Sequence, residues 1–326
     1  MVVSQKRMML IINPNSKPLK VALFLQMIIS KFEKGGYTVD LFKTHGEGDA
    51  TRIAHEAALS NKYEIVVAGG GDGTVNEVLN GLMPQPCKMG ILPLGTSNVL
   101  CRSLNLPLNP LKAADAILSG RSKKIDLGQA NDRYFAIMVS CGYDAYAIEQ
   151  TSLRAKRFTG KYAYIYAGIK SIYHYQPQRI YLISDGKPVS YNAMVIVVSN
   201  AHLYGGNYRL TPDAQIDDGV FDVFIYTGNN VYRFLYYCVR LLFRHPVEVR
   251  DAVRTRVRNL QLTSPGRVLY QGDGDLFGKL PLTIRILPAV LEIAGVKLHK
   301  AKSTLFNDLT RLRFFNAKRP VVNNTL

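Results

Sequence analysis

The sequence predicts two domains: an N-terminal α/β domain with a parallel, Rossmann-like sheet, and a C-terminal domain that is mainly an antiparallel β-sandwich. Strand-like apolar runs alternate strictly with helical patterns up to residue 125, whereas short strands separated by Gly, Asn, Asp or Pro follow Asp126. A chain of 326 residues, 47% of them hydrophobic, is long enough for two cores. We therefore expect domains at 1–126 and 127–296, followed by a basic tail at 297–326.

The elements of the first domain follow from the period of the apolar residues. Strands are expected at 8–13, 37–43, 63–68 and 88–93, and helices at 19–34, 49–60 and 74–82, with two more helical stretches up to residue 119. In a parallel sheet, ligands bind beyond the carboxyl ends of the strands. Four polar or Gly-rich segments fall at that edge: NPNSK, THGEGDA, GGGDGT and LGTSN. We expect these four segments to form one rim.

The second domain is predicted from many short strands with turn residues between them. The pattern fits a sandwich or a barrel, interrupted by helical insertions around 144–173 and 230–244. The expected strands are 123–130, 134–140, 179–184, 192–200, 220–228, 259–264, 267–275, 282–288 and 291–295.

Composition limits the partners and the compartment. A formal net charge of +17 favours polyanions such as nucleotides or an anionic membrane, although a solvated basic surface is also compatible with it. Four widely spaced cysteines without a CxxC pair favour a reducing compartment and no zinc site. No apolar run reaches the ~20 residues of a membrane span. These observations predict a cytoplasmic protein that is soluble or peripherally membrane-associated.

The glycine-rich turn GGGDG is the strongest local signal of a ligand site. It lies between a strand and a helix expected to begin near Thr74, where unpaired N–H groups and the helix dipole favour an anion. Glycine permits close approach of the backbone and φ > 0. Asp72 would repel phosphate unless a cation lies between them, which favours Mg²⁺-bound nucleotide. A turn that only packs, with Asp72 in solvent, is the alternative, and the other rim segments weigh against it.

The motifs GGGDGTVNEV, NPNS, THGEGDA and PLGTSNVL resemble the diacylglycerol kinase catalytic-domain family, which includes bacterial lipid kinases and sphingosine kinases. The resemblance continues through GYDA, GKYAYIYAGIK, TPDAQIDDGVFDV and QGDGD. It implies ATP bound in the cleft between a nucleotide-binding domain and a β-sandwich lipid-substrate domain. The nucleotide positions that it implies are Asn13, Pro14, Asn15, Ser16, Lys17, Thr44, Gly70, Gly71, Asp72, Gly73, Thr74, Val75, Asn76 and Thr96.

The resemblance also implies catalytic and metal positions. Asp273 and Asp275 stand where the family has the DGE motif that supplies the proton acceptor, and both stay candidates for the base, with Asp72 organising the metal. A plain hairpin turn is the alternative for this pair. A structural Mg²⁺ site is implied at Asp218 and the carbonyls of Gln215 and Val220, with a solvated turn as the alternative.

Two further departures from the family pattern bear on function. Lys17 stands where the family has Gly, and either adds a cation near the phosphates or faces solvent. Val99 stands where many diacylglycerol kinases have Asp, which weakens a Mg²⁺ network with Asp72 and Asp126 and leaves the lipid acceptor open. The expected substrate is a membrane lipid hydroxyl.

The segment NVYRFLYYCVRLLFRHP is expected to lie at an anionic membrane surface, or to pack on the sandwich with its arginines in water. Arg233, Arg240 and Arg244 share one helical face, and Phe234, Leu235, Leu241 and Leu242 supply an apolar one. The lysines and arginines of the tail would either add to the attraction to an anionic membrane or only make the chain more soluble. A homodimer is left open.

Other functions remain as alternatives. These are a soluble-substrate kinase of the NAD kinase-like type, and a non-catalytic nucleotide or phospholipid sensor on the same scaffold. A nucleic-acid partner is not expected, because no RNA- or DNA-binding motif accompanies the charge.

Overall fold

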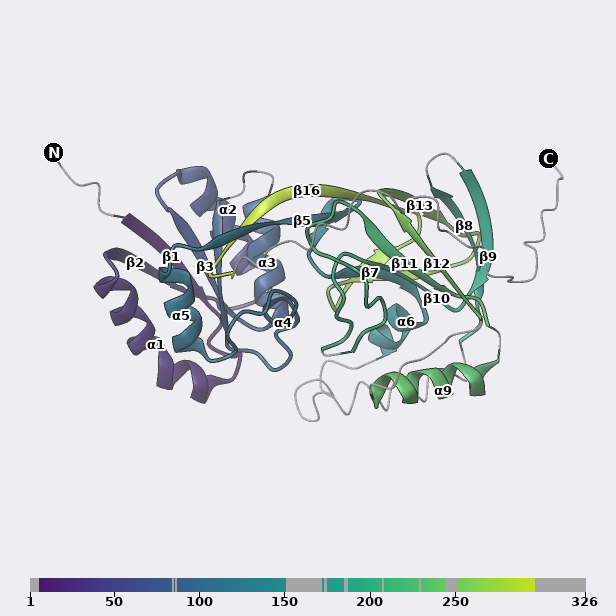
Figure 1. Cartoon of the computed structure of the whole chain (residues 1–326), viewed down its shortest axis with the longest axis horizontal. Helices are drawn as coiled ribbons and strands as arrows, with labels where there is room; N and C mark the ends of the chain where they lie inside the picture. Colours follow the sequence, from purple (N-terminus) through teal and green to yellow (C-terminus); the bar gives the residue numbers. More distant parts are fainter. Residues whose placement is uncertain are drawn as a thin grey trace.

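The computed structural model describes residues 6–150 apart from 84 and 86, residue 172, and residues 175–184, 187–206, 208–228, 230–243 and 251–296. The motif at 160–170, Arg244 and the tail at 297–326 lie outside the described residues. The described chain forms two lobes, with the long strands β5 (Ser122–Ala130) and β16 (Leu282–Ala294) running from one lobe into the other (Figure 1). No described helix is long and apolar enough to cross a membrane.

The first lobe confirms the predicted α/β alternation. Its strands are all parallel to their neighbours, in the order β2-β1-β3-β4. They are β1 (Lys6–Ile12), β2 (Tyr37–Lys43), β3 (Ile65–Gly70) and β4 (Lys88–Pro93). The helices are α1 (Pro18–Lys34), α2 (Asp49–Ser60), α3 (Asp72–Leu82), α4 (Val99–Ser103) and α5 (Pro110–Leu118). All six residues of β3 are buried, as expected for a central strand covered on both faces.

The first sheet does not end with the first lobe. It continues from β4 through β16 to β13 (Asn259–Thr263), β8 (Gln178–Ser184) and β9 (Lys187–Ala193), and β5 and β6 (Arg133–Phe135) pair at its side. The boundary predicted at residue 126 falls inside β5. The prediction of two strands at 282–288 and 291–295 was wrong: one strand, β16, covers both. A shift in register between Leu287 and Leu291 accommodates Pro288, so pairing with β5 resumes beyond it.

A second sheet completes the predicted antiparallel sandwich. Its order is β12-β11-β10-β7-β14-β15, with every neighbouring pair antiparallel. The strands are β7 (Met138–Gly142), β10 (Val195–Ser199), β11 (Phe221–Tyr226), β12 (Ala252–Val257), β14 (Leu269–Gly272) and β15 (Asp275–Lys279). Helices α6 (Tyr143–Gln150) and α9 (Val231–Leu242) belong to the same lobe. Buried side chains such as Phe135, Ile196, Phe221 and Ile284 fill the space between the sheets.

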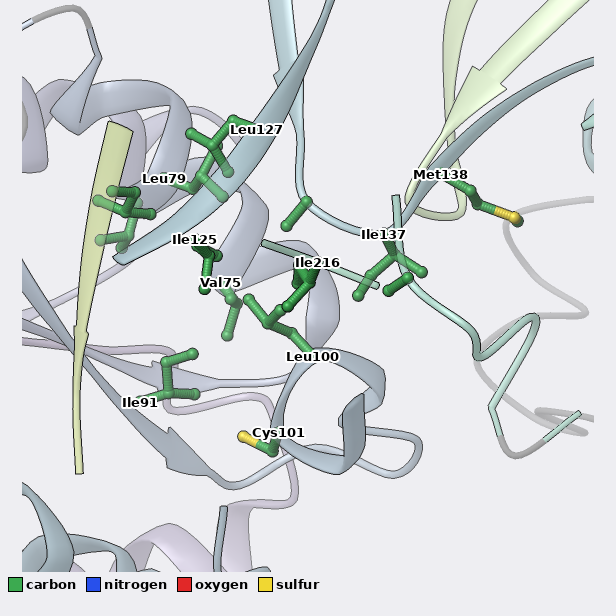
Figure 2. Close-up of a cluster of buried hydrophobic side chains, with 14 of the residues drawn as sticks. Val75, Leu79, Ile91, Leu100, Cys101, Ile125, Leu127, Ile137, Met138 and Ile216 are labelled. Carbon is green, nitrogen blue, oxygen red and sulfur yellow. The ribbon is translucent and has the colours of Figure 1, made fainter. Parts of the chain in front are cut away.

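A continuous apolar core joins the lobes beneath the predicted rim. Figure 2 shows Val75 of α3 beside Leu100 of α4, with Ile216 and Ile137 of the second lobe close to them, and Leu79 farther along α3, near Leu127. All six side chains are at least nine-tenths buried. Because both lobes contribute side chains to this core, its packing fixes the position of one lobe relative to the other.

Candidate active site

The four predicted rim segments meet at the carboxyl edge of β1 to β4. The backbone N–H of Asn13 donates to the carbonyl of Gly69 at 2.9 Å, and that of Thr44 donates to Ile12 at 2.9 Å. The N–H groups of Leu94 and Gly95 both donate to the Gly70 carbonyl at 3.0 Å. Backbone hydrogen bonds therefore hold these turns together.

The NPNS turn is tied to helix α3 by the side chain of Asn13. Its amide nitrogen donates to Thr74 Oγ1 at 3.2 Å, and its amide oxygen accepts the N–H of Asn15 at 2.9 Å. Ser16 Oγ faces the glycine turn, 3.5 Å from where a Cβ on Gly71 would lie. Pro14 lies between these residues in the same turn. This turn therefore borders the first residues of α3.

The glycines of the turn allow two backbone segments to approach each other closely. They do not adopt unusual backbone angles. None of Gly69, Gly70, Gly71 and Gly73 has a positive φ, so of the two properties that glycine permits the turn uses only the close approach. A Cβ on Gly70 would lie 2.4 Å from Thr74 Oγ1. A Cβ on Gly95 would lie 2.3 Å from the Cα of Gly71. The two loops thus pack backbone against backbone.

Helix α3 begins at Asp72, two residues earlier than predicted, and presents an uncapped N-terminus. Its N-cap, Gly71, has extended backbone angles and no side-chain cap. The N–H groups of Gly73 and Thr74 are therefore available to an anion, whereas the Asp72 N–H bonds the Asp72 carboxylate, and the dipole favours negative charge there. Gly73 is exposed on this turn. Val75, an implied nucleotide position, instead points into the interlobe core, and its N–H donates to Gly71.

Asp72 has a structural partner of its own. Its Oδ1 accepts the backbone N–H of Val99, the first residue of α4, at 2.6 Å. Burial raises the pKa of this carboxyl, while the N–H groups of Val99 and Asn98 act in the opposite direction. The carboxylate thus holds the LGTSN loop in place, which sequence reasoning did not foresee. Thr96 is exposed on that loop.

Two lysines add positive charge at the same edge. Lys17 is exposed, with a left-handed backbone (φ 62°), the conformation for which Gly is favoured. This conformation explains why the family pattern described in the sequence has Gly at this position. Lys20 donates from Nζ to the Pro93 carbonyl at 3.0 Å. Burial and, to a smaller extent, the charge of Lys17 lower the pKa of Lys20.

The QGDGD segment is a hairpin that meets this rim from the other lobe. Its tip residues, Asp273 and Gly274, have φ of 51° and 97°, as required in a tight two-residue turn between β14 and β15. Asp275 is exposed, and its Oδ2 lies 3.8 Å from where a Cβ on Gly73 would be. The sequence predicted both aspartates as site residues, and the structure brings them to the N-terminus of α3.

The carboxylate of Asp273 is held by a row of backbone donors. Oδ1 accepts N–H groups from Ile137 at 3.0 Å and Met138 at 2.9 Å. Oδ2 accepts the Ala136 N–H at 2.8 Å and the Asn76 amide at 3.4 Å. Burial raises the pKa of Asp273 to about 6, and the three N–H groups oppose this rise. The carboxylate is thus enclosed but remains a proton acceptor near neutral pH.

Asn80 is a site residue that sequence reasoning missed. One turn after Asn76 on α3, its amide oxygen accepts the Tyr134 N–H at 2.8 Å and its amide nitrogen donates to the Tyr134 carbonyl at 3.0 Å. The segment that carries the donors to Asp273 begins two residues later. The signal was available in the sequence, because two asparagines at i and i+4 interrupt the apolar pattern of α3.

A buried polar network supports the hairpin from behind. Gln271 accepts the N–H of Gly274 at 2.9 Å and donates to Ser140 Oγ and, at 3.3 Å, to Asp144 Oδ2. Asp144, from the GYDA motif, also accepts from Ser140 and from Tyr204 at 3.3 Å. Burial raises the pKa of the Asp144 carboxyl. The network links α6 and β7 to the backbone of the hairpin tip.

The QIDDGV turn lies beside a cluster of carboxylates. Asp126 is buried and accepts the N–H of Gly219 at 2.7 Å and of Ala289 at 2.7 Å. Burial, together with the charges of Asp222 and Asp126, raises the pKa of Asp218 to about 6, while the Val220 N–H and Arg256 act in the opposite direction. No group of three or more His, Cys, Asp or Glu side chains within the described ranges is arranged to hold a metal ion.

Comparisons with known proteins find relatives that span both lobes. Residues 7–130 match the diacylglycerol kinase catalytic domain, and residues 137–295 match the YegS C-terminal NAD kinase beta sandwich-like domain. A diacylglycerol kinase of Bacillus subtilis is 31% identical over 85% of this chain and 92% of its own, and one of Staphylococcus carnosus is 30% identical over 89% and 95%. The crystal structure of a diacylglycerol kinase from Bacillus anthracis has the same fold (TM-score 0.74, 24% identity, 89% of this chain and 96% of that one).

Proposed function

The chain belongs to the diacylglycerol kinase catalytic-domain family and is a kinase, and from that premise we propose that it transfers the γ-phosphate of ATP to a hydroxyl of a membrane lipid, with diacylglycerol as the first candidate. One observation carries the proposal: the Asp273–Asp275 hairpin of one lobe meets the uncapped N-terminus of α3 in the other. In this arrangement a phosphate-binding helix N-terminus would face a proton acceptor.

The phosphates of ATP are assigned to the rim. The N–H groups at the start of α3, its dipole and the lysines at positions 17 and 20 provide positive potential beside Gly70 and Gly71, which carry no side chain of their own. Ser16 and Thr96 supply hydroxyl groups at the same edge. We assign the nucleotide to this surface, with Val75 contributing only to the core.

Asp273 is proposed as the base. Its pKa of about 6 lies closer to neutral than that of an ordinary carboxyl. Of its four hydrogen bonds, the 3.4 Å bond from Asn76 is the longest, so a lipid hydroxyl would replace it most easily. The other three would keep the carboxylate aimed as the proton is taken. Asp275, exposed over Gly73, is the alternative base.

Magnesium is proposed at two places. At the rim, Asp72 would organise Mg²⁺ that accompanies ATP, and the ion would supply charge neutralisation of the phosphates. In the second lobe, Asp218 with the carbonyls of Gln215 and Val220 would hold a structural ion. The local chemistry fits a hard cation, since Asp218 is crowded by Asp222 and Asp126.

Peripheral association with an anionic membrane is proposed through α9. Its exposed stripe differs from the one predicted: Phe234 is buried and Leu235 packs on the core, whereas Tyr232, Tyr236, Val239 and Phe243 are exposed. Arg240 donates to Tyr236 on this face at 2.8 Å, and Arg233 pairs with Asp251. Aromatic side chains with arginines suit the boundary between headgroups and acyl chains.

The decisive experiment is transfer of labelled γ-phosphate from Mg-ATP to vesicle-borne lipids, with soluble NAD in parallel. The lipids should include diacylglycerol, monoacylglycerol, phosphatidylglycerol, ceramide and sphingosine, because Val99 leaves the acceptor open. A labelled lipid is expected. Label on NAD alone would favour the soluble-substrate kinase, and ATP binding without any transfer would favour the sensor.

A further inference from the structure

The first half of α1 exposes a surface without charge. Its exposed residues are Pro18, Leu19, Ala22, Leu23, Gln26 and Met27. Leu19 is 89% exposed, Leu23 64% and Met27 51%. Their spacing of four residues places them in one stripe along about 12 Å of the helix.

This stripe is not explained by the core of the first lobe. The side chains with which α1 packs on the sheet are on its other face, at Val21, Ile28 and Phe32. A helix at the surface of a globular protein normally carries polar or charged residues on its outer face. Single exposed leucines need no explanation, but a row of large apolar side chains marks an interaction site.

The charges around the stripe indicate that it contacts an anionic bilayer. Lys17 is exposed directly before the helix, and Lys34 is exposed at its last residue. The whole chain carries a formal charge of +17. Apolar side chains flanked by cations are the pattern of helices that lie in the interface of an anionic membrane.

The position of α1 in the molecule is compatible with contact with a bilayer. In Figure 1, α1 and α9 lie along the same lower edge of the molecule, one in each lobe. Lys17, at the rim, immediately precedes α1. We propose that α1 is a second membrane-contact element, which together with α9 seats both lobes on an anionic bilayer. The inference rests on the proposed lipid substrate, because only a bilayer-borne acceptor requires the cleft to be held at a membrane.

The test uses the absence of tryptophan from the chain. Leu23→Trp and Phe243→Trp each create a single indole, on α1 and at the end of α9, and Leu59→Trp places one on α2, where Leu59 is 51% exposed. The full chain is mixed with phosphatidylcholine–phosphatidylglycerol vesicles, without ATP or lipid acceptor. We expect a blue shift of the emission at positions 23 and 243 and none at 59. No shift at position 23 while 243 responds would overturn the proposal.

A second set of variants separates docking from dimer formation and from catalysis. Leu19→Gln, Leu23→Gln and Met27→Gln together should lower partitioning onto these vesicles at least about tenfold, while Leu59→Gln has no effect. Mg-ATP binding should be unchanged, because none of the three residues lies in the rim. A blue shift at position 23 that follows protein concentration without vesicles, with a doubled mass, would assign the stripe to a second copy. Vesicle binding by a chain that phosphorylates no lipid would refute the kinase proposal but leave docking intact.

Discussion

The side-chain amide of Asn76 lies 3.4 Å from the carboxylate of Asp273, although the two residues are 197 positions apart in the chain. Asn76 stands on the first turns of the helix that receives the phosphates in our proposal, and Asp273 at the tip of the hairpin from the other lobe. The contact is made by Oδ2, whose other donor is the Ala136 N–H at 2.8 Å, whereas Oδ1 accepts two backbone N–H groups at 3.0 and 2.9 Å.

Asp273→Asn should lower kcat by at least about a hundredfold, because an amide cannot accept the proton. Lipid phosphorylation and Mg-ATP binding should be measured on the same preparation. The amide NH₂ would also oppose backbone donors, so a lower Tm is expected. Asp275→Asn serves as the matched control, with ATP affinity and Tm unchanged and a smaller loss of kcat. If Asp275→Asn is inactive and Asp273→Asn is active, the assignment of the base must be reversed.

The pH dependence of kcat/KM tests the same residue independently of the folding of variants. A base must be deprotonated, so activity should be present above the raised pKa of Asp273 and be lost as the pH falls through about 6. The acidic limb should remain in Asp275→Asn. An acidic limb near pH 4, the ordinary range of a carboxyl, would show that the enclosed Asp273 does not govern the reaction.

The period of apolar residues was sufficient to predict the strands and helices of the first lobe, because each is a local, amphipathic or fully buried segment. Pairing between distant strands is not local, so the continuation of the sheet from β4 into β16 could not be derived from pattern alone. Pro288 was interpreted as the end of a strand, whereas a shift in register absorbs it. The donors to Asp273 also escaped prediction, since they are backbone groups exposed by the break between β6 and β7.

Gly95→Ala tests whether the glycine loops are required for close approach. The new Cβ would lie 2.3 Å from the Cα of Gly71 and 2.9 Å from Asn98 Oδ1, so the loops must separate. We expect a loss of about 1–3 kcal/mol in the free energy of unfolding and weaker ATP binding. Gly73→Ala is the control for stability, because among the described residues its Cβ would meet only Asp275 Oδ2, at 3.8 Å. Denaturant titration of both variants measures the difference, and equal stabilities would refute the packing argument.

Gln271→Met tests the network behind the hairpin. Methionine is similar in length but can neither accept the Gly274 N–H nor donate to Asp144. The tip of the hairpin should therefore become less ordered. A fall in kcat of about tenfold with KM for ATP unchanged is expected, because the nucleotide rim is in the other lobe. A variant that loses kcat and ATP affinity equally would indicate general unfolding instead.

Lys17 holds a left-handed backbone that glycine adopts without strain, so Lys17→Gly should raise the free energy of unfolding by about 0.5–1 kcal/mol. Lys17→Ala separates the two properties of the residue: it removes the ammonium group but keeps the Cβ, so stability should stay at the level of the parent chain. If the charge of Lys17 assists the phosphates, KM for ATP should rise by a similar factor in both variants, and more at low ionic strength, where screening is weak. A KM unchanged in both would mean that Lys17 faces solvent only. A Lys17→Gly variant no more stable than Lys17→Ala would contradict the strain argument.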